Sequence, residues 1–339
     1  MKRYAWQDAS ETELLSLRFR DLKLGIANTP LEGRIKRLYA ELAARGLRFR
    51  PHCWLAEEWF SPDGVPGIAI PFYLAHRRLM QLEHKQMLGV EGGTDRWCMQ
   101  LLRHEAGHAL DTAYGLHRRR RWKELFGRFD KPYPRHYAPR PQSRNYVLHL
   151  DWWYAQSHPA EDFAETFAVW LPLGDRWKRD YAGWGALRKL CYVDELMASL
   201  ARRRPRNRKR ERIEPLRHNA RTLAEHYTEK LKLYDTEVPA VYDAELRRLF
   251  APPGEPAGAK RSAAAFLRRH ASALRDSCAR GTGEHPYVID QILQEMVVRC
   301  RELKLRVAGV EQETRLNVAI FIVVHTLNYL RRARYRVPL

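Results

Sequence analysis

The spacing of apolar residues predicts that helices make up most of this chain. Near its start, four apolar residues recur at the three- and four-residue intervals of one helical face: Leu31, Ile35, Leu38 and Leu42. Thr29 and Pro30 stand where a helix begins, and Gly46 stands where this helix should end. Similar patterns predict further helices over residues 73–87, 160–170, 187–201 and 216–233.

Short strands are predicted before the centre of the chain. Residues 17–26 alternate loosely and predict a first strand, and the aromatic-rich residues 47–60 predict more strand structure. A proline- and glycine-containing turn then leads to a strand over residues 65–72, whose prolines favour the edge of a sheet. We therefore expect an α+β fold, with a small mixed sheet over a central helix and a helical lobe after it.

A segment rich in proline and glycine predicts the division of the chain into domains. Residues 251–258 have the composition of a linker. Residues 1–250 would then form one domain, and residues 259–339 would form a small helical C-terminal domain.

The charge balance adds a possible class of partner. The 339 residues contain 60 Lys and Arg against 40 Asp and Glu, a formal net charge of +20. Such a balance favours acidic partners, nucleic acid or anionic membrane surfaces. Part of the charge lies in a run from Arg202 to Arg212, which we expect to be exposed and not catalytic. A solvated loop and a contact to a polyanion or nucleic acid remain alternatives for this run.

Three features of the sequence predict a cytoplasmic protein. The 5 cysteines are scattered without a C-x-x-C pair, which argues against a disulfide framework. The first residues lack the apolar core of a signal peptide. The longest strongly apolar run, residues 318–324, is too short to span a bilayer, so no transmembrane segment is expected.

The candidate chemistry is concentrated in His104-Glu105-Ala106-Gly107-His108, inside a helix predicted between Thr94 and Gly115. His104 and His108 are one turn apart on one helical face, so both imidazoles can reach one ion. Glu105 stands where a carboxylate can take a proton from metal-bound water. This H-E-x-x-H pattern is the signature of zinc metallopeptidases.

A second helix, opened by Pro159, can supply the third ligand that a catalytic zinc usually has. Glu161 and Glu165 are four residues apart and share one face of it. One carboxylate can bind the metal, and the other can accept the free ring N–H of a ligand histidine.

Together, these two segments resemble the gluzincin metallopeptidases. The resemblance is greatest to bacterial zinc-binding metallopeptidases and more distant to the catalytic domain of anthrax lethal factor, and it covers about residues 15–200. It implies a zincin-like fold in which Glu161 binds Zn²⁺ and Glu165 supports a ligand histidine. It also implies that Tyr154 stabilises the oxyanion, although the nearby His158 is an alternative for that role.

The expected function is zinc-dependent hydrolysis of peptide bonds in a peptide or protein substrate. Glu105 would act as the general base, and the strand over residues 65–72 would hold an extended substrate by backbone pairing. One alternative is a basic nucleic-acid-binding protein with a structural or vestigial zinc site. Another is a metal-dependent hydrolase that acts on something other than peptides.

Overall fold

The computed structural model of the protein describes residues 3–134, 136–172, 174–233, 243–253, 261–332 and 337–338. It divides into two compact units. The first unit comprises residues 1–84, 90–226 and 336–339, and the second comprises residues 85–89 and 227–335. The predicted linker falls partly outside the described residues, because residues 254–258 are not among them.

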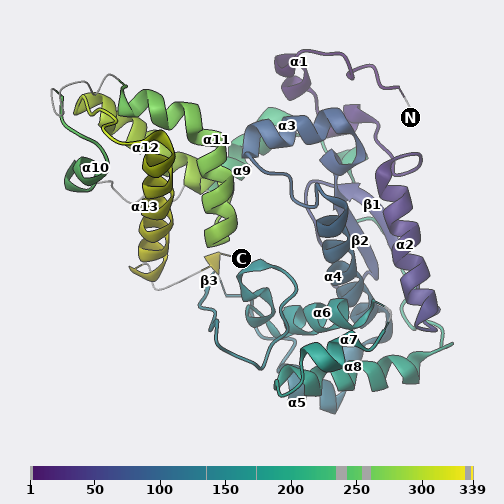
Figure 1. The fold of residues 1–339 in the computed structure, drawn as a ribbon. Coiled ribbons are helices and arrows are strands. Elements are labelled where there is room, and N and C mark those ends of the chain that lie inside the picture. Colours follow the sequence, from purple (N-terminus) through teal and green to yellow (C-terminus); the bar gives the residue numbers. More distant parts are fainter. Residues whose placement is uncertain are drawn as a thin grey trace. The chain divides into compact units, whose positions relative to one another are not determined.

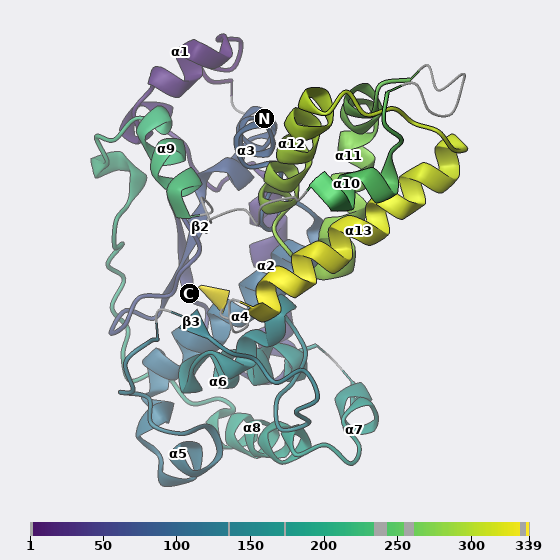
Figure 2. The ribbon, with the colours of Figure 1, turned by 90° about the vertical axis from the view of Figure 1, so that its left-hand side faces the viewer.

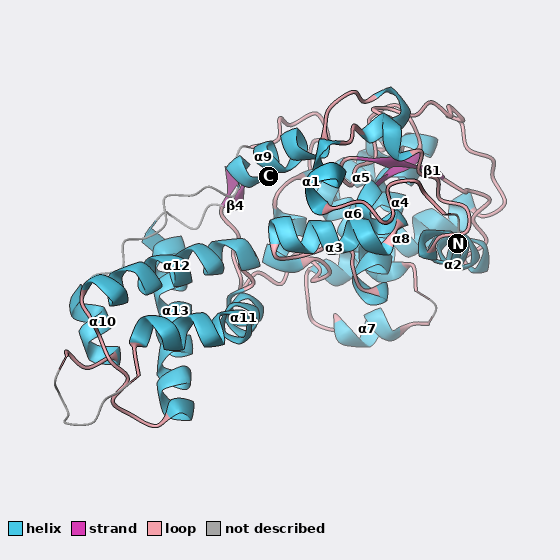
Figure 3. Ribbon diagram, turned by 90° about the horizontal axis from the view of Figure 1, so that it is seen from above, coloured by secondary structure: helices cyan, strands magenta, loops and turns pink. Residues whose placement is uncertain are grey.

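Helices dominate the described chain, as Figure 3 shows. From the N-terminus to residue 233 these are α1 (Glu11–Ser16), α2 (Pro30–Ala44), α3 (Arg77–Met87), α4 (Asp95–Tyr114), α5 (Arg120–Phe126), α6 (Pro159–Trp170), α7 (Arg176–Asp180), α8 (Ala186–Leu200) and α9 (Leu223–Leu233). Short 3-10 helices occur at Phe19–Leu22, Phe72–Ala75, Leu116–Arg118, Asp151–Gln156 and Leu216–His218. Among the described residues, no helix is both long and apolar enough to cross a membrane.

The sheet is smaller than the sequence suggested. β1 (His52–Ala56) and β2 (Gly67–Pro71) pair in parallel, with His52 opposite Gly67 and Ala56 opposite Pro71. A second pair, β3 (His136–Tyr137) and β4 (Val337–Pro338), is antiparallel. The chain is thus mainly helical with a small parallel sheet, and the zincin-like architecture remains a prediction.

The first predicted strand, over residues 17–26, is wrong. This stretch begins directly after α1 and contains the 3-10 helix Phe19–Leu22. Phe19 and Leu22 are both buried, while the two residues between them are exposed. Burial therefore recurs after three residues, which is the period of a 3-10 turn, and not after the two residues of a strand.

The strand predicted at residues 65–72 is present as β2, but its edge is not open. All five residues of β2 are buried. On the side away from β1, Phe60 makes an antiparallel bridge to Ala69, and the Ala69 N–H donates to the Phe60 carbonyl at 2.8 Å. The expectation that this strand pairs with a substrate is therefore wrong at Ala69, because the turn after residue 60 brings the chain's own backbone there.

The core of the first unit forms around α4. This helix packs against α2, α6 and β2, and α6 packs in turn against α5 and α8 (Figures 1 and 2). Gly107 permits the close approach of α4 to α6, since a Cβ at this position would lie 2.9 Å from the Ala164 Cα. The α4–α6 contact is therefore the structural basis of the site described below.

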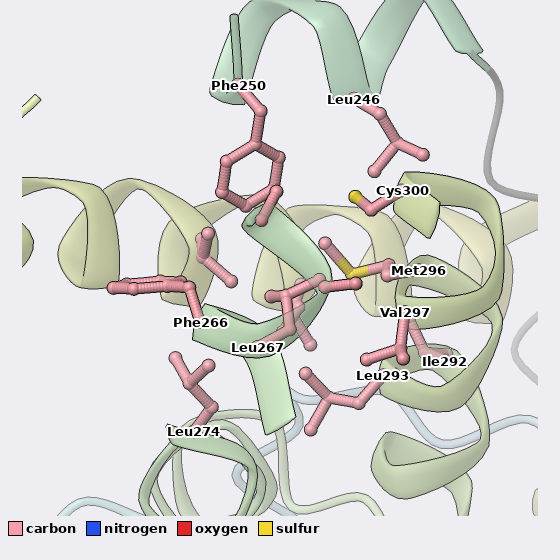
Figure 4. Packing of buried hydrophobic residues seen from close by; sticks show 14 of the residues in the cluster. Leu246, Phe250, Phe266, Leu267, Leu274, Ile292, Leu293, Met296, Val297 and Cys300 are labelled. Carbon is pink, nitrogen blue, oxygen red and sulfur yellow. The ribbon is translucent and has the colours of Figure 1, made fainter. Parts of the chain in front are cut away.

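The second unit contains α10 (Asp243–Leu249), α11 (Ala263–Thr282), α12 (Pro286–Glu302) and α13 (Glu311–Arg332). Its core is formed by buried residues that include Phe266 and Leu267 of α11 and Leu293 and Met296 of α12 (Figure 4). The helices predicted beyond about residue 260 are thus present within this unit.

Candidate metal centre

The caps of α4 set the position of its two histidines. The Thr94 hydroxyl accepts the Trp97 N–H at 3.2 Å, which satisfies one of the free donors at the helix start. Gly115 ends the helix with a φ of 63°, in the left-handed region that favours glycine. Both predicted ends are confirmed. His104 and His108 lie on the face of α4 that packs against α6.

α6 brings the carboxylates to this face. His158 is its N-cap, since the ring Nδ1 accepts the Ala160 N–H at 3.1 Å, and Pro159 is its first residue. Glu161 and Glu165 follow one turn apart, and both are buried. Buried carboxylates are costly unless they are paired, and both face the histidines of α4.

Three side chains converge on one point. The Glu161 Oε2 lies 3.0 Å from the His104 Nε2 and 3.1 Å from the His108 Nε2, and the two nitrogens are 3.1 Å apart. Two ligand atoms at about 2.0–2.1 Å from a tetrahedral zinc lie about 3.3 Å apart. This nitrogen, nitrogen and oxygen set therefore fits a zinc ion in both chemistry and spacing.

Glu165 fixes the orientation of His104. The His104 Nδ1 lies 2.8 Å from the Glu165 Oε1, and the Glu165 Oε2 accepts the Leu150 N–H at 2.9 Å. A carboxylate at Nδ1 accepts a hydrogen bond from the ring N–H, which keeps the proton on Nδ1 and leaves Nε2 available to an ion. Burial alone would lower the pKa of His104, but hydrogen bonds to Glu161 and Glu165 raise it well above its ordinary value.

Glu105 stands beside the three ligand candidates without a partner of its own. Within the described part of the chain, its buried Oε2 has no hydrogen-bond partner. Burial raises the pKa of this carboxyl group. Together with His104, His108 and Glu161, Glu105 lines a cavity of about 610 Å³. An unpartnered carboxylate of this kind is suited to exchange a proton with a molecule in the cavity.

Two tyrosines line the same cavity. Tyr154, which the sequence suggested, has its ring centroid 5.7 Å from that of His104. Tyr133, which sequence reasoning missed, donates its hydroxyl to the Glu161 Oε1 at 2.6 Å. Tyr133 lies in a segment without helical or strand periodicity, so no spacing signal placed it near the ligands.

His158, the alternative to Tyr154, is occupied elsewhere. Its Nδ1 caps α6, and its Nε2 lies 2.7 Å from the Lys131 carbonyl oxygen. Because both ring nitrogens are bonded to backbone groups, His158 positions the start of α6. Among the described residues that line the cavity, Tyr154 and Tyr133 are the two that carry a phenolic hydroxyl.

A buried ion pair anchors α6 on the side away from α4. Lys189 of α8 lies 2.6 Å from Asp162 and also donates to the Asn145 carbonyl at 2.8 Å. Burial raises the pKa of Asp162 to about 7, although Lys189 opposes this shift. Since Asp162 follows Glu161 directly, this pair helps to hold the third ligand candidate in place.

The fold and the site together define a candidate metal centre carried by two crossed helices, with two histidines and one glutamate as ligands. Residues 92–229 match the model of a protein family described as "Putative zinc-binding metallo-peptidase". The matched region contains α4 and α6, and so includes every candidate ligand. Comparisons with curated proteins and with solved structures found no match.

Proposed function

We propose that this protein hydrolyses peptide bonds with a zinc ion held by His104, His108 and Glu161. The family match supports a zinc-binding peptidase, and the convergence of these three side chains supports a metal site. The observation that carries the proposal is the unpartnered Glu105 carboxylate in the same cavity. A structural zinc site has no need of such a group, so Glu105 favours a hydrolase over a nucleic-acid-binding protein with a vestigial site.

When bound at these ligands, zinc would lower the pKa of a water molecule and polarise the scissile carbonyl. The remaining roles belong to the chain. Glu105 takes the proton of the attacking water and passes it to the leaving amine. Its buried position raises its pKa, which makes the carboxylate a stronger base for the proton of the attacking water.

The tyrosines of the cavity complete the proposed mechanism. Burial raises the pKa of Tyr154, so its hydroxyl remains protonated and can donate to a developing oxyanion. Tyr133 already donates to Glu161, which orients that carboxylate toward the histidines. Glu165 orients the imidazole of His104 in the same way.

The deciding experiment is Glu105→Gln, which keeps the size of the side chain and removes the base. The variant should fold, retain about one zinc per chain, and lose hydrolysis by about 10²- to 10⁴-fold, the usual contribution of general-base catalysis. Glu124→Gln of α5, whose side chain is 54% exposed, is the matched control and should leave turnover unchanged. Zinc content and turnover are measured on the same preparation. Wild-type cleavage by a zinc-loaded Glu105→Gln protein would show the mechanism to be wrong.

A further inference from the structure

A second cavity begins one helical turn beyond the metal centre. It has a volume of about 690 Å³ and shares three lining residues with the cavity of Glu105, namely Asp63, Thr112 and Phe129. Thr112 follows His108 by four residues of α4, a rise of about 6 Å along the helix axis. The two cavities therefore adjoin, and the second lies within the reach of a substrate held in the first.

Arginines dominate the wall of this second cavity, which we call the arginine cavity. Five of them line it: Arg118, Arg119, Arg203, Arg204 and Arg206. One carboxylate, that of Asp63, also faces it, and the nearby Asp111 is already hydrogen-bonded to His117. In the described part of the chain, no ion pair involves any of the five guanidinium groups. The cavity therefore carries an excess of positive charge, five guanidinium groups against the one carboxylate of Asp63.

The backbone of residues 203–207 is held by hydrogen bonds to α4 and to Gly64. The amide groups of Arg206 and Asn207 both donate to the Ala113 carbonyl at 3.0 Å. The Tyr114 hydroxyl donates to the Arg203 carbonyl at 2.9 Å, and the Asn207 side chain donates to the Gly64 carbonyl at 2.8 Å. These bonds hold like charges together at one wall, an arrangement that is unfavourable until an anion occupies it.

We propose that the arginine cavity binds acidic side chains of the peptide substrate a few residues from the cleaved bond. The inference rests on the proposed peptidase function. An extended peptide advances about 3.3 Å per residue, so two or three residues span the turn of α4 between His108 and the arginine cavity. Guanidinium groups suit carboxylates because they can donate two parallel hydrogen bonds. The volume of about 690 Å³ fits a few side chains, which favours a peptide over a nucleic acid.

The test compares two triple variants with the same loss of charge. Arg203→Gln, Arg204→Gln and Arg206→Gln remove three arginines of the cavity and spare the backbone bonds. Lys209→Gln, Arg210→Gln and Arg212→Gln remove three exposed charges of the same run that do not line the cavity. Both sets are made in the Glu105→Gln protein loaded with zinc, so that binding is measured without turnover.

The probes are two fluorescein-labelled eight-residue peptides that differ only in carrying three glutamates or three glutamines. Fluorescence anisotropy should show tighter binding of the glutamate peptide. The cavity variant should weaken that binding by roughly 10-fold, since exposed ion pairs each contribute modestly, and the effect should shrink in high salt. The control variant should change it by less than about 2-fold.

Three results would overturn the inference. The two peptides could bind equally, or the two triple variants could weaken the glutamate peptide equally, which would mean that only diffuse charge acts. An eight-nucleotide single strand could also bind more tightly than the peptide through the same three arginines, which would assign the cavity to nucleic acid. Because none of these readouts requires cleavage, failure of the Glu105 mechanism is distinguished from failure of the arginine cavity.

Discussion

Gly107→Ala tests how strictly the metal centre depends on the α4–α6 contact. The added Cβ would lie 2.9 Å from the Ala164 Cα and 3.2 Å from the Ala164 carbonyl oxygen. Ordinary contact begins at 3.4 Å, and both neighbours are backbone atoms that cannot rotate away. The two helices must therefore separate by roughly half an ångström, which exceeds the tolerance of about 0.2 Å in metal–ligand distances.

Gly33→Ala is the matched control, because Gly33 also lies inside a helix and a Cβ there meets nothing within 4 Å. Both substitutions gain about 1 kcal/mol of helix propensity. Only Gly107→Ala incurs the overpacking penalty of about 1–3 kcal/mol, so it should be less stable than Gly33→Ala by that amount. Its zinc affinity should also fall, on the order of 10-fold, because Glu161 moves with α6.

Urea unfolding measures the stability difference, and competition with a chromophoric chelator measures the zinc affinity. Both are run on the full-length chain. A Gly107→Ala protein that matches Gly33→Ala in stability and the wild type in zinc affinity would refute the reasoning. Such a result would mean that α4 and α6 can separate without disturbing the ligands.

Three other predictions follow from the same structure. Metal analysis should find no zinc in Glu161→Ala or in the double variant His104→Ala/His108→Ala. In contrast, Glu165→Ala should keep zinc with roughly 10- to 100-fold weaker affinity. If Glu165→Ala loses zinc and Glu161→Ala keeps it, the roles assigned to the two glutamates must be exchanged. Lys189→Ala should destabilise the protein by about 3 kcal/mol because Asp162 would remain buried without its partner, while the neighbouring exposed Arg188→Ala should have little effect in the same urea assay. Burial, reinforced by the charge of Lys230, lowers the pKa of His285 from 6.5 to about 4. As the pH falls, the unfolded chain therefore binds this proton before the folded chain does, and the free energy of unfolding should decrease between about pH 6.5 and pH 4. His285→Asn keeps an acceptor for the Tyr287 N–H, and a urea midpoint with unchanged pH dependence in this variant would contradict the assignment.

Local signals in the sequence were sufficient to predict the elements that carry the site. Thr94, Gly115 and Pro159 mark the ends of α4 and α6 by well-understood capping chemistry. The i, i+4 spacing inside each helix then places two histidines on one face and two glutamates on another. The meeting of these faces agrees with their burial, because buried carboxylates need partners and the two imidazoles supply them.

Other parts of the site depend on contacts that no local pattern encodes. Tyr133 reaches Glu161 from an irregular segment, and Lys189 reaches Asp162 from a helix two elements further along the chain. The bridge from Phe60 to Ala69 likewise depends on how a turn folds back in space. Phe19 and Leu22 show the converse case, in which a short apolar stretch fits both a strand and a 3-10 turn until tertiary burial decides.

Because its ligands are far apart along the chain, a bound metal would also affect the stability of the fold. His108 and Glu161 are 53 residues apart, so an ion bound by both would close a long loop, as a disulfide does. Tyr133 and Tyr154, which line the cavity of Glu105, both lie inside that loop. Zinc supply would therefore govern the lifetime of the folded chain as well as its chemistry, because the ion stabilises only the state in which α4 and α6 are already together.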